Sequence, residues 1–233
     1  AVAEATLVDE DGQFIELQGI PIYVRDAGDG EAGTLLMMHG LFGSTEVWRY
    51  NVEGLVEAGF RVIRFDRPAF GLSYKGDDFD YSVGNQADLT AELMTALDLE
   101  QAIIVGHSAG GNVATHFAVR HPERVEQLVL VDAASLAGGP PGFVGGIVAL
   151  PSVWRWARFA LQNIFTREQL ENSLRSFYVD DSFWTDEDTD AYWRAFQTAG
   201  WDAGLLALTR DGGGNLLGED AIRSIEAETL IIW

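Results

Sequence analysis

The sequence predicts an α/β domain in which a mostly parallel sheet carries helices on both faces. Short apolar runs and helically spaced segments alternate regularly between residues 20 and 132. Helical spacing alone then extends over residues 133–226, and one more apolar run follows at residues 229–233. A length of 233 residues suits one such domain with an inserted helical subdomain. We therefore predict a core at residues 1–134, a helical cap at 135–226 and a return strand of the core at 227–233.

The first part of the chain predicts strands joined by polar turns. Short extended runs at residues 5–8 and 13–17 lie on either side of Asp11-Gly12. Residues 20–25 are β-branched and aromatic, which is typical of a half-exposed strand, and residues 34–38 are almost wholly apolar. We expect the first strands to enter the sheet as an antiparallel hairpin.

Helices and strands then alternate towards residue 132. The apolar stripe of residues 46–59 predicts a helix that ends at Gly59, because glycine is favoured just past a helix C-terminus. The next predicted elements are a strand at 60–65, a helix at 83–97, a strand at 102–105, a helix at 111–120 and a strand at 124–131.

The region after residue 133 predicts helices without a core strand. It begins with a stretch rich in glycine and proline at 138–146, which predicts a flexible, apolar hinge. Helices are expected around residues 153–165, 167–177, 186–197 and 201–208. Their apolar and aromatic stripes fit the core of a helical subdomain. In functional terms, the same pattern predicts a lid over the ends of the strands.

Charge and composition exclude several classes of protein. The chain has 36 acidic and 15 basic residues, a net charge of −21, and Lys75 as its single lysine. This balance argues against a nucleic-acid partner, whose phosphates need Lys and Arg. The scattered acids indicate a solvated surface, either of an ordinary acidic bacterial protein or of a salt-adapted one, which the scarcity of lysine favours.

The remaining composition points to a protein without disulfides or membrane spans. The absence of cysteine excludes disulfides and thiol catalysis. The first residues show no signal peptide and no apolar run reaches 18 residues, so we predict no transmembrane segment and a cytoplasmic location.

The clearest functional signal is the motif G-H-S-A-G at residues 106–110. A G-x-S-x-G motif between an apolar strand and a helix is typical of a nucleophilic serine, because the sharp turn holds the hydroxyl at the carboxyl edge of the sheet. The small Gly106 and Gly110 allow strand and helix to approach closely. The Ala109 N–H and the helix N-terminus can stabilise negative charge there. This context favours Ser108 as a nucleophile over a plain strand–helix turn.

Together with the elbow, two further motifs resemble the α/β-hydrolase fold family. They are His39-Gly40 after an apolar strand and D-R-P-A-F-G-L-S at residues 66–73, and R-H-P-E-R-V at 120–125 is also typical of the family. The resemblance covers nearly the whole chain. It is strongest to the subgroup with a helical cap, which includes carboxylesterases, C–C bond hydrolases, lactonases, perhydrolases, epoxide hydrolases and haloalkane dehalogenases. The last two use an Asp where Ser108 stands, so the resemblance favours the serine enzymes.

The resemblance implies acyl transfer. Ser108 would attack a carbonyl, and the backbone N–H groups of Ala109 and Leu41, with Phe42 as the alternative donor, would hold the oxyanion. Each such donor contributes on the order of 3 kcal/mol to the transition state. His39 would position the second donor, which is a structural role.

The chain departs from the family pattern at the base. The family order is serine, then acid, then histidine, but no histidine follows His121 here. His107 is expected to point beneath the elbow, His116 lies about 12 Å along the elbow helix, and His121 lies at its far end. Asp132 resembles the alternative acid position of haloalkane dehalogenases, or it organises its own loop.

Three explanations stay open for the missing base. In the first, the chain lacks the last strand, helix, acid and histidine of the family, which the open apolar edge at residues 230–233 favours. In the second, a partner or a second copy covers that edge and supplies the base, and a second copy would make the protein a homo-oligomer. Otherwise the protein binds a ligand without chemistry.

We therefore predict a serine hydrolase of carboxylic esters or related acyl compounds. The alternative is a hydrolase-like, non-catalytic ligand-binding protein or an inactive fragment. The aromatic helical region indicates an apolar small-molecule substrate. The chemistry needs no metal or organic cofactor, and we expect the acids at residues 77–80 and 180–181 to be solvated loops.

Overall fold

The computed structural model describes residues 6–134, 142–212 and 217–233. Within these residues seven strands form one sheet in the order β1-β2-β4-β3-β5-β6-β7. The strands are β1 (Gly12–Leu17), β2 (Ile20–Ala27), β3 (Gly33–Met38), β4 (Phe60–Phe65), β5 (Ala102–His107), β6 (Val125–Val131) and β7 (Glu228–Ile232). The pairs β1–β2 and β2–β4 are antiparallel and all other pairs are parallel. The predicted fold, with its antiparallel entry, is confirmed.

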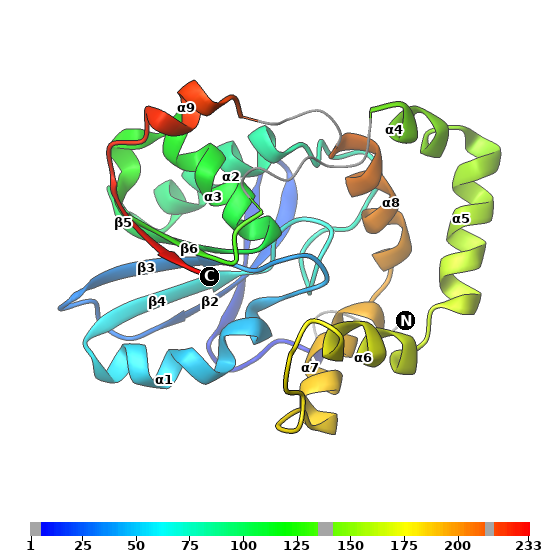
Figure 1. Cartoon of the computed structure of the whole chain (residues 1–233), viewed down its shortest axis with the longest axis horizontal. Helices are drawn as coiled ribbons and strands as arrows, with labels where there is room; N and C mark the ends of the chain where they lie inside the picture. Colours follow the sequence, from blue (N-terminus) through cyan, green and yellow to red (C-terminus); the bar gives the residue numbers. More distant parts are fainter. Residues whose placement is uncertain (1–5, 135–141, 213–216) are drawn as a thin grey trace.

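Helices cover both faces of the sheet (Figure 1). α1 (Arg49–Glu57) follows a 3-10 turn at Thr45–Trp48 and lies on one face, whereas α2 (Val83–Ala96) and α3 (Ala109–Arg120) lie on the other, together with α9 (Glu219–Arg223). Alternate side chains of β3 point to opposite faces of the sheet and belong to two separate parts of the core. Leu35 and Met37 pack on the α1 side, and Leu36 and Met38 join the larger cluster beneath α2 and α3.

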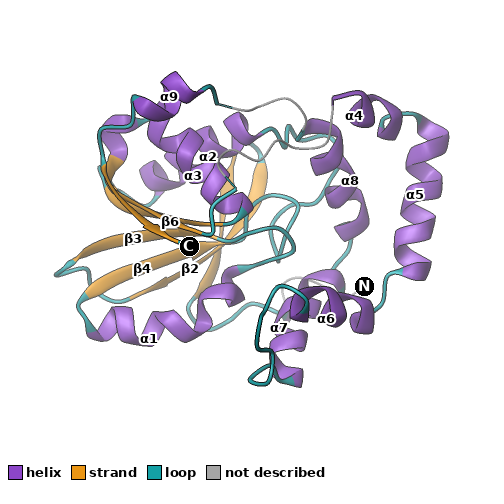
Figure 2. Ribbon diagram, viewed as in Figure 1, coloured by secondary structure: helices purple, strands orange, loops and turns teal. Residues whose placement is uncertain are grey.

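A helical segment lies between β6 and β7. It contains α4 (Gly142–Val148), α5 (Pro151–Ile164), α6 (Arg167–Arg175), α7 (Asp186–Phe196) and α8 (Trp201–Asp211). Figure 2 shows these helices gathered beyond one end of the sheet. Capping boxes at Thr166 and Thr185 begin α6 and α7, and the segment has its own buried cluster around Leu170, Trp184 and Phe196. None of the described helices has both the length and the apolarity needed to cross a membrane.

β7 forms one edge of the sheet. It pairs with β6 along one side, and its side chains, including Leu230 and Ile231, are exposed. The strand predicted at the end of the chain is therefore present and continues the parallel order.

The predicted strand at residues 5–8 is wrong for the part that the structure describes. Residues 6–8 belong to no strand, and Asp9 beside them is held by a side chain instead of a strand ladder. The Asp9 N–H donates to the Tyr23 hydroxyl at 2.9 Å, and that hydroxyl donates to the Asp9 carboxylate at 2.8 Å. A tyrosine side chain therefore anchors the segment.

The predicted hinge at residues 138–146 is also wrong from residue 142 onwards, and its first part lies outside the described residues. Residues 142–148 form α4. A Cβ added at Gly145 would lie 2.4 Å from the carbonyl oxygen of Arg210 in α8. Glycine at this position permits close packing of two helices, and it does not mark a break between them.

Candidate active site

Ser108 lies at the apex of a sharp turn between β5 and α3. Its backbone has φ 51° and ψ −120°, a conformation that non-glycine residues rarely adopt. A Cβ on Gly106 would lie 2.7 Å from the Gly110 carbonyl oxygen, and a Cβ on Gly110 would lie 2.4 Å from the Met38 carbonyl oxygen. The strand–turn–helix geometry expected around Ser108 is therefore present, and both glycines are required by close backbone contacts.

Hydrogen bonds to neighbouring elements hold this strained turn. The Ser108 N–H donates to the Val131 carbonyl at 3.0 Å, at the end of β6. The Ser108 carbonyl accepts from the Gly111 N–H and from the Ala134 N–H, each at 2.9 Å. The turn is thus fixed from both the helix and the adjacent strand.

The loop after β3 runs beside Ser108. A Cβ added at Gly40 would lie 3.0 Å from the Ser108 Cβ, which is tighter than most side-chain contacts, so glycine favours this close approach of the loop. Phe42 has φ 59°, and Leu41 is exposed. Among the hydrogen bonds of the described residues, none uses the backbone N–H of Leu41, Phe42 or Ala109. These are the three donors that the sequence predicted for an oxyanion.

His39 is a buried structural residue in this loop. Its Nδ1 lies 2.8 Å from the Gly40 carbonyl and its Nε2 accepts the Arg67 N–H at 3.0 Å, so the ring is neutral with both nitrogens engaged. Burial, and then the Arg67 charge, hold the pKa of His39 well below its ordinary value. His39 therefore connects the ends of β3 and β4 and is not available as a base.

The other three histidines lie at the end of β5, within α3 and directly after α3. His107 packs edge-on against Trp48, with ring centroids 6.3 Å apart, and burial lowers its pKa despite the nearby charge of Asp132. His116 is buried in the middle of α3. His121 at the end of α3 lies 2.8 Å from the Asp88 carboxylate. Within the described residues, no hydrogen bond joins Ser108 to a histidine.

Asp132 follows β6 and lies near the elbow in the chain path. Its side chain is exposed and its backbone has φ 43°. Its N–H donates to the Ile232 carbonyl at 2.8 Å, which links the ends of β6 and β7. The structure therefore places Asp132 at the carboxyl edge of the sheet, two residues before Ala134, which donates to Ser108.

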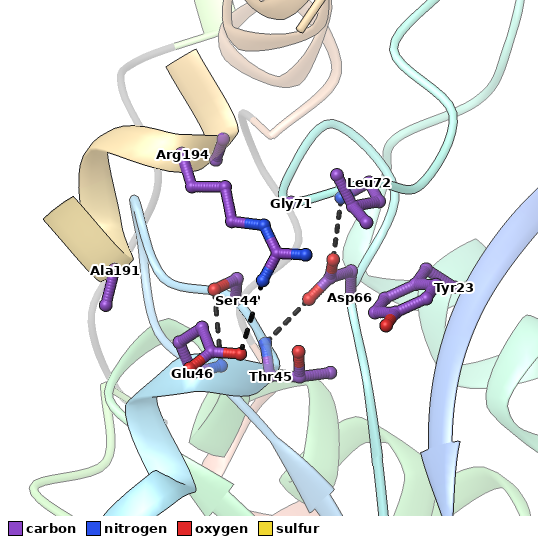
Figure 3. Close-up of a pocket in the computed structure, with 10 residues that line it drawn as sticks. Tyr23, Ser44, Thr45, Glu46, Asp66, Gly71, Leu72, Ala191 and Arg194 are labelled. Carbon is purple, nitrogen blue, oxygen red and sulfur yellow. Dashed lines mark hydrogen bonds and ion pairs between the residues drawn. The ribbon is translucent and has the colours of Figure 1, made fainter. Parts of the chain in front are cut away.

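Sequence reasoning gave no individual role to Asp66, which organises the loops behind the site. Figure 3 shows its buried carboxylate between the backbone N–H groups of Thr45 and Leu72, each 2.6 Å away. A Cβ on Gly71 would overlap this carboxylate at 1.8 Å, which explains the glycine. Burial raises the pKa of Asp66 to about 6, although both backbone hydrogen bonds favour the ionised form.

The helical segment contacts the loops of the core next to these residues. Arg194 of α7 reaches the carboxylates of Asp9 at 3.3 Å and Glu46 at 3.7 Å, and Figure 3 shows it above Glu46. The rings of Phe42 and Phe196 lie 6.0 Å apart. A small cavity of about 10 Å³ lies between these loops and the helices α7 and α8. Its lining residues include Phe42, Phe70, Phe196 and Trp201.

The α/β-hydrolase fold model matches residues 33–233, so the chain belongs to the α/β-hydrolase family of enzymes. The resemblance seen in the sequence motifs is thereby confirmed.

Among similar proteins is the 2-hydroxy-6-oxononadienedioate/2-hydroxy-6-oxononatrienedioate hydrolase 1 of Pseudomonas putida. It is 33% identical over 96% of this chain and 79% of its own length. The hydrolase of the same activity name from Paraburkholderia xenovorans is 34% identical over 72% of this chain but only 57% of its own length. The structure of a meta-cleavage product hydrolase from Pseudomonas fluorescens IP01 has a TM-score of 0.72 and 27% identity, and the match covers 95% of this chain and 79% of that one.

Proposed function

We propose that this protein is a serine hydrolase that cleaves carboxylic esters or related acyl compounds, with Ser108 as its nucleophile. The observation that supports this most is the strained φ of 51° at Ser108, held at the apex of the β5–α3 turn. A strained serine at the carboxyl edge of a parallel sheet presents its hydroxyl to a substrate instead of burying it in the helix.

The oxyanion would be held by the backbone. In the proposed step the Ser108 oxygen bonds to the acyl carbon, its proton passes to a base, and the carbonyl electron pair moves to the oxygen. The Ala109 N–H at the start of α3 and the N–H of Leu41 or Phe42 would receive this charge. The C–O bond to the alcohol then breaks as the alcohol takes the proton, and water releases the acid by the same sequence.

The proposal requires a base that the described residues do not place beside Ser108. His39 has both ring nitrogens engaged, and His121 is bonded to Asp88. The base is therefore a part of the proposed mechanism that the described residues do not supply. Asp132 is the candidate acid within the chain, since it ends the strand next to the elbow. Without the base, the oxyanion donors would leave only residual catalysis.

We further propose that the α4–α8 segment acts as a cap over the site and selects apolar acyl groups. The aromatic rings of Phe165, Phe196 and Trp201 lie within 5.0–5.6 Å of one another. Phe196 also contacts Phe42 in the loop after β3 (residues 39–44), which we call the donor loop. Such a cluster would favour an apolar group next to the scissile carbonyl.

A second candidate reaction is hydrolysis of a carbon–carbon bond beside a ketone. It is favoured by the 33% identity to a Pseudomonas putida enzyme whose name gives a keto-dienedioate as its substrate. The leaving group in that case is carbon, so the carbanion must be protonated as the C–C bond breaks. The two candidates share the Ser108 nucleophile and differ in the leaving group.

The proposal is tested by steady-state hydrolysis with the native protein that contains these residues. We expect turnover of p-nitrophenyl butyrate, with kcat at least 10³-fold lower in Ser108→Ala. A parallel assay with a vinylogous 1,5-diketone acid separates the C–C bond candidate. Equal turnover by the native protein and Ser108→Ala on both substrates would remove Ser108 as the nucleophile. No turnover of either substrate by the native protein would favour a ligand-binding role.

A further inference from the structure

The outer surface of the helical segment carries an unusual group of exposed apolar side chains. They come from α4, α5 and the short turn between them, and we call them the α4–α5 patch: Phe143, Ile147, Leu150, Trp156, Phe159 and Ile164. Trp156 is 71% exposed and Phe159 is 59% exposed, and their rings touch edge to face at 5.9 Å. Large apolar side chains that gather on a surface indicate an interaction site.

Helical spacing directs most of these side chains outwards. Phe143, Ile147 and Leu150 follow one another at intervals of four and three residues, and Trp156 and Phe159 are three residues apart. α5 contacts α8 on its inner side, and Figure 2 shows it as the outermost helix of the segment, far from the sheet. No residue of α5 is fully buried. α5 therefore exposes Trp156 and Phe159 on its outer side, whereas Trp154 packs against the core of the protein.

The stretch of chain that carries the patch lacks the acids that are frequent in the rest of the sequence. Residues 133–167 contain no Asp or Glu, although the whole sequence has 36 acids. The same stretch carries Arg155, which is exposed on α5, and Arg158, which pairs with Asp202 at 2.6 Å. Its third arginine, Arg167, pairs with Glu171, Asp186 and Asp190. Screening in salt confines each charge to its neighbourhood, so the exposed Arg155 can act beside the apolar patch despite the net charge of −21.

We propose that the α4–α5 patch docks the protein on a phospholipid surface. A helix that lies in a membrane interface inserts aromatic and aliphatic side chains from one face and places arginine at the headgroups. Trp156 and Phe159 supply the first feature and Arg155 the second. A lipid phosphate is an anion that complements Arg155, the exposed arginine next to Trp156 on α5.

The docking surface is distinct from the candidate active site. It lies on the outside of the helical segment, whereas the Phe42–Phe196 contact lies on its inside, against the loops of the core. Docking therefore does not depend on Ser108 as a nucleophile. If the proposed hydrolase activity also holds, docking would keep the site where apolar acyl compounds concentrate.

The test is flotation of the purified protein with vesicles of phosphatidylcholine and phosphatidylglycerol at a 4:1 ratio. We expect the native chain to float with the vesicles, and binding to fall at least tenfold in the double variant Trp156→Ser/Phe159→Ser. Arg155→Glu should weaken binding and Arg155→Lys should restore it. Phe177→Ser is the matched control, because Phe177 is 79% exposed on the same helical segment but lies close to Asp180 and Asp181.

Two results would overturn the proposal. One is the absence of vesicle binding by the native chain, or equal binding by the double variant and the native chain. The other is a native dimer in sedimentation velocity that the double variant converts to a monomer, which would assign the patch to self-association. Thermal unfolding of each variant checks that the fold is retained, and Ser108→Ala should bind vesicles as the native chain does.

Discussion

Phe42 and Phe196 join the loop beside Ser108 to the helical segment. Their ring centroids lie 6.0 Å apart, and Phe196 also contacts Phe165, Trp193 and Trp201. Phe42 has a positive φ of 59°, so its backbone conformation depends on contacts that hold it there. The position of one proposed oxyanion donor is therefore coupled to the packing of α7.

The first prediction concerns this contact. Phe196→Ala should lower the free energy of unfolding by about 3 kcal/mol, because a buried aromatic ring is removed. It should also lower kcat for ester hydrolysis more than it changes KM, since the donor loop loses its support. Chemical denaturation and steady-state kinetics measure the two effects. Phe177→Ala, at an exposed position, is the control and should change neither; a kcat loss of equal size in this control would contradict the coupling.

The second prediction concerns the tight elbow. Gly110→Ala should destabilise the fold by about 2 kcal/mol and lower activity by about 10²-fold, because the added Cβ meets the backbone oxygens of Met38 and His39 at 2.4 and 2.5 Å. Gly54→Ala is the matched control within α1. No atom lies within 4 Å of its added Cβ, so this variant should gain up to about 1 kcal/mol of stability. Thermal unfolding distinguishes the two, and a neutral Gly110→Ala would contradict the described geometry.

The third prediction concerns the pH dependence that Asp66 introduces. Its pKa is about 6 in the folded protein and near 3.8 in the unfolded chain, so the folded state binds more protons between these values. The contribution of Asp66 to stability should therefore rise as pH falls from 7 to 4, by up to about 3 kcal/mol. Asp66→Asn should lack this dependence. Denaturant unfolding of both proteins from pH 4 to 8 gives the difference, and parallel curves would exclude the effect.

The fourth prediction has the opposite sign of pH dependence. Burial opposes ionisation of Asp188, but hydrogen bonds from Thr185 and Tyr50 and the Arg49 charge hold its pKa below the usual value. Its stabilising contribution is therefore present above pH 4 and lost as pH falls below that value. Asp188→Ala should cost about 3 kcal/mol at pH 7, because it leaves the partly buried Arg49 without its carboxylate. Asp190→Ala, whose carboxylate is largely exposed in its pair with Arg167, should cost less than 1 kcal/mol in the same unfolding experiment.

The sequence predicted the sheet and the elbow because these features depend on local pattern. Apolar runs such as residues 102–105 and the small residues around Ser108 specify strand and turn without knowledge of distant contacts. The prediction of a hinge failed at Gly145 because glycine is needed there for a close contact with Arg210, 65 positions along the chain. In the same way, the role of Asp66 depends on Thr45 and Leu72, which only the folded chain brings to its carboxylate.

The most direct test of the central claim is covalent labelling of Ser108. The native protein is treated with a fluorophosphonate, and its intact mass and its peptides are measured. The proposal predicts one adduct per chain on the peptide that contains Ser108, and no adduct in Ser108→Ala. A folded, full-length native protein that stays unlabelled, or an adduct that persists in Ser108→Ala, would contradict the assignment of Ser108 as the nucleophile.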